Sequence, residues 1–297
     1  MSILNDLSIY ELLGVLILSL VPTIIFVSLI LISDQKSREP IELIIICLLS
    51  GFFTISFSLL IGRIILPSLD AFRDRIFDLK SFSIIRIIIL ALIEEYSKLV
   101  VLYFFMSHNK KFDDIYDGFV YSSLIALSFA GMETLLYIFN ETSYQDMTSL
   151  AVMRNVSTIP LHLVCGIAMG YYVALDRFSN VKKYKIINLI KCILMPVFIH
   201  SVYNSFFSIT MINLRTKPYA LLIILIFLIS IYFIGILYLR RIIELNNIFI
   251  DDKEYPDEYK NLMTQSEFIK ERNIKEGKDS SLEEIIYNDN DFTPFKN

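Results

Sequence analysis

Seven long apolar runs constrain the fold of this chain more than any other feature. They lie near residues 10–33, 41–62, 82–107, 115–140, 150–175, 186–212 and 219–239. Each run is long enough to cross a hydrocarbon core of ~30 Å, which takes roughly 20 helical residues. Backbone polar groups in lipid must be bonded within their own segment, and the runs lack the alternating polarity of barrel strands. We therefore predict an all-α fold, a polytopic membrane helix bundle of about seven transmembrane helices.

The segment between the second and third runs has a different pattern. From Ile65 to Leu79, apolar residues recur at three- and four-residue steps, and charged residues fill the rest of the helix circumference. This pattern predicts an interfacial amphipathic helix on the membrane surface. An ordinary solvated linker helix is the alternative.

Charge divides the chain into two parts. Residues 1–241 form the predicted bundle, and residues 242–297 are expected to be a charged, cytoplasmic, largely disordered tail that holds the acidic surplus. Short loops on the side of the tail carry ten Lys or Arg residues against six on the other side, which places the N-terminus outside. The expected location is the cell membrane, as a multi-pass protein in the lipid bilayer. No basic face is concentrated enough for a nucleic-acid partner.

Four of the runs contain polar residues that are costly in lipid. The third run reads IIILALIEEYSKLVVLYFF, in which Glu94 and Glu95 are adjacent and Lys98 follows Glu94 by one turn on the same face. A Glu–Lys ion pair that only holds helices together would explain one carboxylate. Two adjacent carboxylates in a low dielectric do not both ionise readily, and such a pair can supply a general base and its supporting acid.

Each of the other three runs carries one such position. Glu133 lies one turn after Phe129 and has no cation in its own run, so its partner must come from another helix. His162 lies on a stripe with glycines, which are typical of close helix packing. His200 precedes Asn204 by one turn, a pair suited to fixing a tautomer or stabilising an oxyanion. Taken singly, each could be a hydrogen-bonded core residue.

Depth along the helices indicates that the four positions form one site. At ~1.5 Å of rise per residue, each lies about 20 Å from the cytoplasmic end of its run. Polar side chains on four helices at one level predict a shared polar cavity. The candidate catalytic residues are Glu94, Glu95, Glu133, His162 and His200, and the candidate supporting or oxyanion-binding residues are Lys98 and Asn204.

The ordered combination of motifs is more specific than any one of them. The motifs are Glu94-Glu95-x-x-Lys98, Phe129-x-x-x-Glu133, His162-x-x-x-Gly166 and His200-x-x-x-Asn204, all within residues 84–204. Together they resemble the PrsW family of membrane-embedded glutamic proteases, distantly related to the CAAX prenyl proteases and the bacteriocin-immunity membrane proteins. The wider superfamily more often has His at the position of Glu133, and this departure matches the PrsW branch. The resemblance implies an endopeptidase acting on a membrane-anchored protein substrate, with an anti-sigma factor as the best-known substrate type.

The residues favour a metal-free reaction. Glu94, assisted by His200, would deprotonate a water that attacks the peptide carbonyl, and Asn204 would donate to the oxyanion. Glu133 and His162 would orient this water or protonate the leaving amine. We expect no cofactor and no metal.

Lys98 would steady Glu95 or Glu94, and its place on the Glu94 stripe makes Glu94 the expected base. Metal-assisted hydrolysis is the closest alternative, since two His and one Glu can form an open zinc site, although the HExxH spacing is missing. Two other classes remain open. They are a proton-coupled transporter and a non-catalytic, immunity-type membrane protein that binds a peptide.

Overall fold

The chain is built from helices wherever its structure is described. A computed structural model describes residues 7–34, 38–71, 73, 79–106, 109–179, 182–214 and 219–253. Within these ranges the elements are α1 (Ile9–Ser33), α2 (Ile41–Asp70), α4 (Leu79–Val101), the π-helical turn η2 (Leu102–Met106), α5 (Ile115–Ile138), α6 (Tyr144–Val156), α7 (Thr158–Phe178), α8 (Lys182–Leu214) and α9 (Ala220–Lys253). The predicted all-α fold is confirmed.

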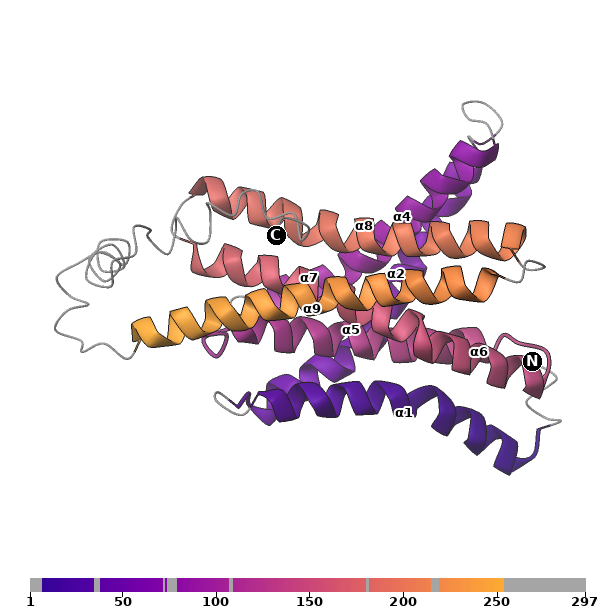
Figure 1. The fold of residues 1–297 in the computed structure, drawn as a ribbon, viewed down its shortest axis with the longest axis horizontal. Helices are drawn as coiled ribbons and strands as arrows, with labels where there is room; N and C mark the ends of the chain where they lie inside the picture. Colours follow the sequence, from indigo (N-terminus) through magenta and orange to yellow (C-terminus); the bar gives the residue numbers. More distant parts are fainter. Residues whose placement is uncertain are drawn as a thin grey trace.

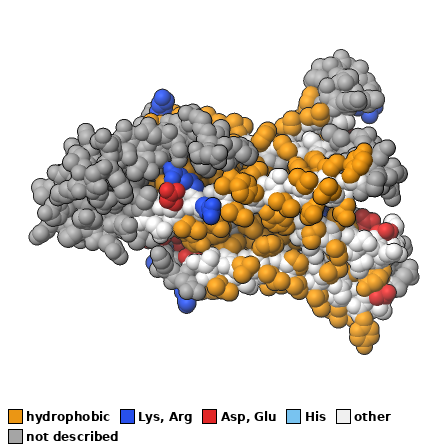
Figure 2. Space-filling model, viewed as in Figure 1, with side chains coloured by type: hydrophobic (Ala, Val, Ile, Leu, Met, Phe, Trp, Pro, Cys, Tyr) orange, Lys and Arg blue, Asp and Glu red, His pale blue; other side chains and the backbone are white. Residues whose placement is uncertain are grey.

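Six helical segments of the described chain are long and apolar enough to cross a membrane. They are Ile9–Ser33, Ile41–Asp70, Ile115–Ile138, Tyr144–Phe178, Lys183–Ser208 and Ala220–Asn247. The third predicted run is also helical, as α4, but it carries several charged side chains. Apolar side chains cover much of the face shown in Figure 2, and Lys, Arg, Asp and Glu side chains lie toward its ends. The chain is therefore a multi-pass membrane protein.

Helices α5 and α7 form the centre of the bundle. Most residues of both helices are buried, and α1, α8 and α9 run roughly along the same axis while α2 and α4 run obliquely to it (Figure 1). A Cβ atom at Gly170 of α7 would overlap the carbonyl oxygen of Gly118 and the hydroxyl of Ser122 on α5. The two backbones are thus in direct contact, as glycines permit between membrane helices.

Helix α6 connects the centre of the bundle to α1. Pro22 lies inside α1 and has no N–H, so the carbonyl of Leu18 lacks its usual helical donor. The side-chain amide of Asn155 on α6 donates to this carbonyl at 2.8 Å. The break between α6 and α7 falls at Ser157, and Pro160 follows in the first turn of α7, where a missing N–H costs little.

Two predicted boundaries lie elsewhere in the structure. The first residues of the predicted interfacial helix, Ile65 to Asp70, are the end of α2, and most of the segment from 72 to 78 lies outside the described residues. The boundary expected at 241/242 falls inside α9, where Ile242 and Leu245 are buried. The rest of the predicted tail, residues 254–297, lies outside the described residues.

Candidate active site

Helix α4 presents Glu94, Glu95 and Lys98 to the interior of the bundle. Glu95 and Lys98 are buried, with 0% and 1% of their surface exposed, and Glu94 is 7% exposed. The ammonium of Lys98 lies 2.7 Å from Oε1 of Glu95. The same oxygen lies 2.7 Å from Nδ1 of His200 on α8. Glu95 is therefore held by two donors from two helices.

Lys98 extends this network to α7. Its Nζ lies 2.9 Å from Nδ1 of His162 and 4.2 Å from the centre of the Phe129 ring on α5. The Phe129 ring also meets the His162 ring edge-on, at 5.3 Å between centroids. An ammonium has three N–H donors and no acceptor. These donors face a carboxylate, an imidazole nitrogen and an aromatic face.

Glu133 of α5 closes the far side of the site. Its Oε2 lies 3.0 Å from Nε2 of His162 and 2.6 Å from a guanidinium nitrogen of Arg154 on α6. Arg154 also donates through Nε to the Thr134 hydroxyl at 3.1 Å, and its guanidinium lies over the Tyr137 ring. The cation that Glu133 requires thus comes from another helix, as the sequence predicts.

The hydrogen-bond partners of the two imidazoles, Lys98 for His162 and Glu95 for His200, assign where their protons lie. Because an ammonium only donates, Nδ1 of His162 must accept from Lys98, and Nε2 of His162 then carries the proton that it donates to Glu133. Nδ1 of His200 carries a proton toward the ionised Glu95. Nε2 of His200 is left with a lone pair. The two rings therefore have opposite tautomers.

The side chains of Glu94 and His200 face each other. Oε2 of Glu94 lies 3.7 Å from Nε2 of His200, and this oxygen is buried without a hydrogen-bond partner among the described residues. A carboxylate oxygen and an imidazole lone pair are both acceptors, and at 3.7 Å apart a water that donates to both has to lie beside the pair. Asn204 lies one turn beyond His200 on α8 and is partly buried.

The structure brings six of the seven predicted site residues into one contact network and places Asn204 one turn away. Of the two carboxylates that Lys98 was expected to steady, it bonds to Glu95, three residues before it, although it shares its helical face with Glu94. Arg154 and Thr134 belong to the site but were not among the predicted residues. The signal for Arg154 was a charged residue near the start of an apolar run.

A membrane bundle with a buried cluster of carboxylates and imidazoles defines a class of proteins with a polar centre inside the bilayer. This chain belongs to the PrsW family, because the model described as "PrsW family intramembrane metalloprotease" matches residues 39–234, well over half of its length. It is therefore an intramembrane protease of the cell membrane.

Individual relatives agree with this assignment. The chain is 27% identical over 226 residues to a protein named Protease PrsW from Clostridioides difficile, covering 75% of this chain and 89% of that one. It is 33% identical over 193 residues to Protease PrsW from Oceanobacillus iheyensis, covering 65% and 82%. No solved structure matches the chain.

The description of the family implies a bound metal ion. The positions of the side chains show whether they could bind one. Glu94, His162 and His200 each offer one ligand atom, and these atoms lie within 4.8 Å of one another. Two imidazoles and one carboxylate are a common zinc donor set. However, Nδ1 of His162 faces the ammonium of Lys98, and Nε2 faces Glu133. In this arrangement the site does not fit a metal ion.

Proposed function

We propose that this intramembrane protease hydrolyses peptide bonds with a water activated by Glu94. The observation that supports this role is the facing pair of Glu94 Oε2 and His200 Nε2, 3.7 Å apart, in a site where the other carboxylates are engaged by cations. Glu95 is paired with Lys98 and Glu133 with Arg154. Glu94 is thus the carboxylate left to exchange a proton with a substrate or water.

The reaction begins with a water that donates one hydrogen bond to Glu94 and one to Nε2 of His200. Glu94 takes the proton as the water oxygen attacks the peptide carbonyl, and the side-chain amide of Asn204 donates to the developing oxyanion. Glu94 then returns the proton to the leaving nitrogen as the carbon–nitrogen bond breaks. Glu94 ends as it began, so no other proton source is needed.

The remaining residues position this pair. Glu95 holds His200 in the tautomer whose lone pair faces the water. Lys98 balances the charge of Glu95, and His162 joins Lys98 to Glu133. Rigid support of this kind matters because general acid–base catalysis depends on hydrogen-bond distances of about 3 Å.

The substrate that we propose is a membrane-anchored anti-sigma factor. This part of the proposal rests on the resemblance to the family. The buried position of the site supports a substrate that is itself in the membrane, because the peptide bond must reach Glu94 from within the bilayer region.

Cleavage by the purified chain tests the proposal. The chain is reconstituted in lipid vesicles with a single-span anti-sigma factor, and the products are identified by mass spectrometry. We expect cleavage by the parent chain and by Glu244→Gln, which alters an exposed ion pair, and none by Glu94→Gln. Binding of the substrate without cleavage would favour the peptide-binding alternative, and equal cleavage by Glu94→Gln would rule out the proposed base.

A further inference from the structure

We infer that Lys98 is a built-in cation that takes the place of a metal ion's charge and engages one of its ligands, so that the site is closed to zinc unless Lys98 is removed. The inference rests on the contacts of Lys98 and concerns ion binding, which can be measured without a substrate. It therefore stands or falls separately from the proposed peptide hydrolysis.

Lys98 bonds directly to one of the three residues that could hold a metal ion, His162, and indirectly to a second, His200, through Glu95. Its Nζ lies 2.7 Å from Oε1 of Glu95 and 2.9 Å from Nδ1 of His162, and Oε1 of Glu95 is shared with His200. Lys98 itself is 1% exposed. A fully buried ammonium with a partner for each donor is expensive to displace, because its removal leaves the partners unpaired.

Neither nitrogen of His162 can bind a metal ion while Lys98 is in place. A metal on Nδ1 would need the lone pair that accepts from the ammonium. A metal on Nε2 would force the proton onto Nδ1, where it would point at the ammonium, and would displace the bond to Glu133. Of the three residues grouped closely enough to hold a metal ion, this leaves Glu94 and Nε2 of His200, and two protein ligands are fewer than zinc sites use.

Charge balance leads to the same conclusion. The site holds three carboxylates, Glu94, Glu95 and Glu133, and two cations, Lys98 and Arg154. With all three carboxylates ionised and both imidazoles neutral, the sum is one negative charge. Without Lys98 it is two, with both imidazoles free to act as ligands, which is the charge and donor set that a divalent cation would complete.

The first test uses the parent chain and its imidazoles. The chain has three histidines, so His108→Asn leaves only those of the site. With ¹⁵N-labelled histidine, NMR spectra report which ring nitrogen carries the proton. We expect the proton of His162 on Nε2 and that of His200 on Nδ1, with no change when zinc is added after chelation. Opposite assignments, or zinc-dependent shifts in both rings, would overturn the inference.

The second test removes the ammonium. Lys98→Met and, as the matched control, Lys191→Met are stripped with a chelator and dialysed against zinc alone, and bound zinc is measured by elemental analysis. Lys191 lies on α8 with its Nζ 5.8 Å from the Tyr172 ring, away from the site. We expect about one zinc ion per chain in Lys98→Met and none in the parent or control.

A further variant shows that any zinc gained is bound at this site. Adding His162→Asn to Lys98→Met should remove the bound zinc. Stoichiometric zinc in the parent chain, or a folded Lys98→Met chain that binds none, would contradict the inference. If Lys98→Met does not fold, the inference is tested by the NMR spectra of the chain that retains Lys98.

Discussion

Glu94 and Glu95 are neighbours in the sequence but have different surroundings. Glu95 accepts from Lys98 and His200, whereas Oε2 of Glu94 has no hydrogen-bond partner in the described part of the chain and lies 3.7 Å from Nε2 of His200. Adjacent helical residues point about 100° apart, so the two carboxylates are expected to differ in role. In the proposed mechanism Glu95 supports the site and Glu94 is the base.

We predict that glutamine at these two positions gives different defects. Glu94→Gln should lower kcat by at least the ~10²–10⁴-fold typical of a lost general base, with little change in thermal stability. Glu95→Gln should retain measurable turnover with an altered pH profile, and should unfold at a lower temperature because Lys98 loses its counter-charge. Kinetics and thermal unfolding of both variants check this. Equal losses of kcat at equal stability would mean that the two carboxylates act as one unit.

Arg154 and Glu133 offer a second test at the level of residues. Arg154→Met leaves a buried carboxylate without its cation, which typically costs about 3–5 kcal/mol, whereas the double variant with Glu133→Gln removes both charges. We expect the double variant to be more stable than Arg154→Met alone. Thermal unfolding in detergent measures the difference.

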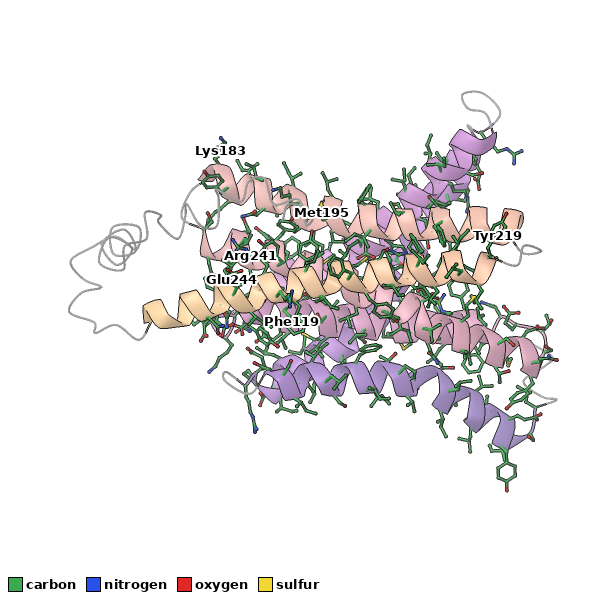
Figure 3. The ribbon with its side chains drawn as sticks, viewed as in Figure 1. Phe119, Lys183, Met195, Tyr219, Arg241 and Glu244 are labelled. Atoms are coloured by element: carbon green, nitrogen blue, oxygen red, sulfur yellow. The ribbon has the colours of Figure 1, made fainter. Side chains whose placement is uncertain are left out.

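The control for this comparison is Glu244→Gln. The Glu244 side chain is 60% exposed and accepts from Arg241 at 2.9 Å on α9 (Figure 3). A charge this exposed contributes about 0–1 kcal/mol to its ion pair, so this variant should unfold close to the parent chain. If Arg154→Met were equally harmless, Arg154 would not be the counter-charge of Glu133.

At the level of elements, the site depends on the direct contact between α5 and α7. Gly118 and Gly170 let the two backbones touch, and the same two helices carry Glu133 and His162. We predict that Gly170→Ala lowers stability by roughly 1–3 kcal/mol, because the added methyl overlaps backbone that cannot move alone. Gly62→Ala on α2 is the control.

An added methyl group has more room at Gly62 than at Gly170. A Cβ there meets only Leu66 Cδ1, at 3.8 Å, so Gly62→Ala should be neutral or slightly stabilising in the helix. Unfolding of both variants by denaturant in mixed micelles measures the difference. Equal stability of the two variants would show that α5 and α7 can separate without cost.

At the scale of the whole molecule, the two ends of the bundle should lie on opposite sides of the membrane. The start of α6 and the end of α9 lie at opposite ends (Figure 1). With Lys and Arg distributed as counted in the loops, reporter fusions after Tyr144 should be extracytoplasmic and fusions after Lys253 cytoplasmic. The opposite pattern would invert the bundle and place the tail outside.

The helices and the depth of the site could be predicted from the sequence, because both depend on the constant rise per residue along a helix axis. Run length gives the spans, and a fixed rise per residue places Glu94, Glu133, His162 and His200 at one level. The partner of Lys98 does not follow, because Glu94 and Glu95 lie four and three residues before it and both are within reach. Packing against α8 decides between them.

Arg154 shows a second limit of the sequence pattern. A single apolar run over 150–175 hides the break at Ser157 that separates α6 from α7. Local periodicity carries no information on how α6 approaches α5, so the ion pair with Glu133 could not be predicted. The extension of α9 beyond residue 241 was missed because polar residues such as Asn246, which is buried against α5, interrupt the apolar pattern.

The most direct test of the proposed metal-free hydrolysis by Glu94 is the cleavage rate of the proposed anti-sigma factor substrate after exhaustive chelation. The chain is stripped of metals, the residual zinc is measured, and the rate is compared with that of the untreated chain. We predict an unchanged rate in the stripped parent chain and no cleavage by Glu94→Gln. Loss of cleavage on chelation, with recovery when zinc is restored, would contradict it.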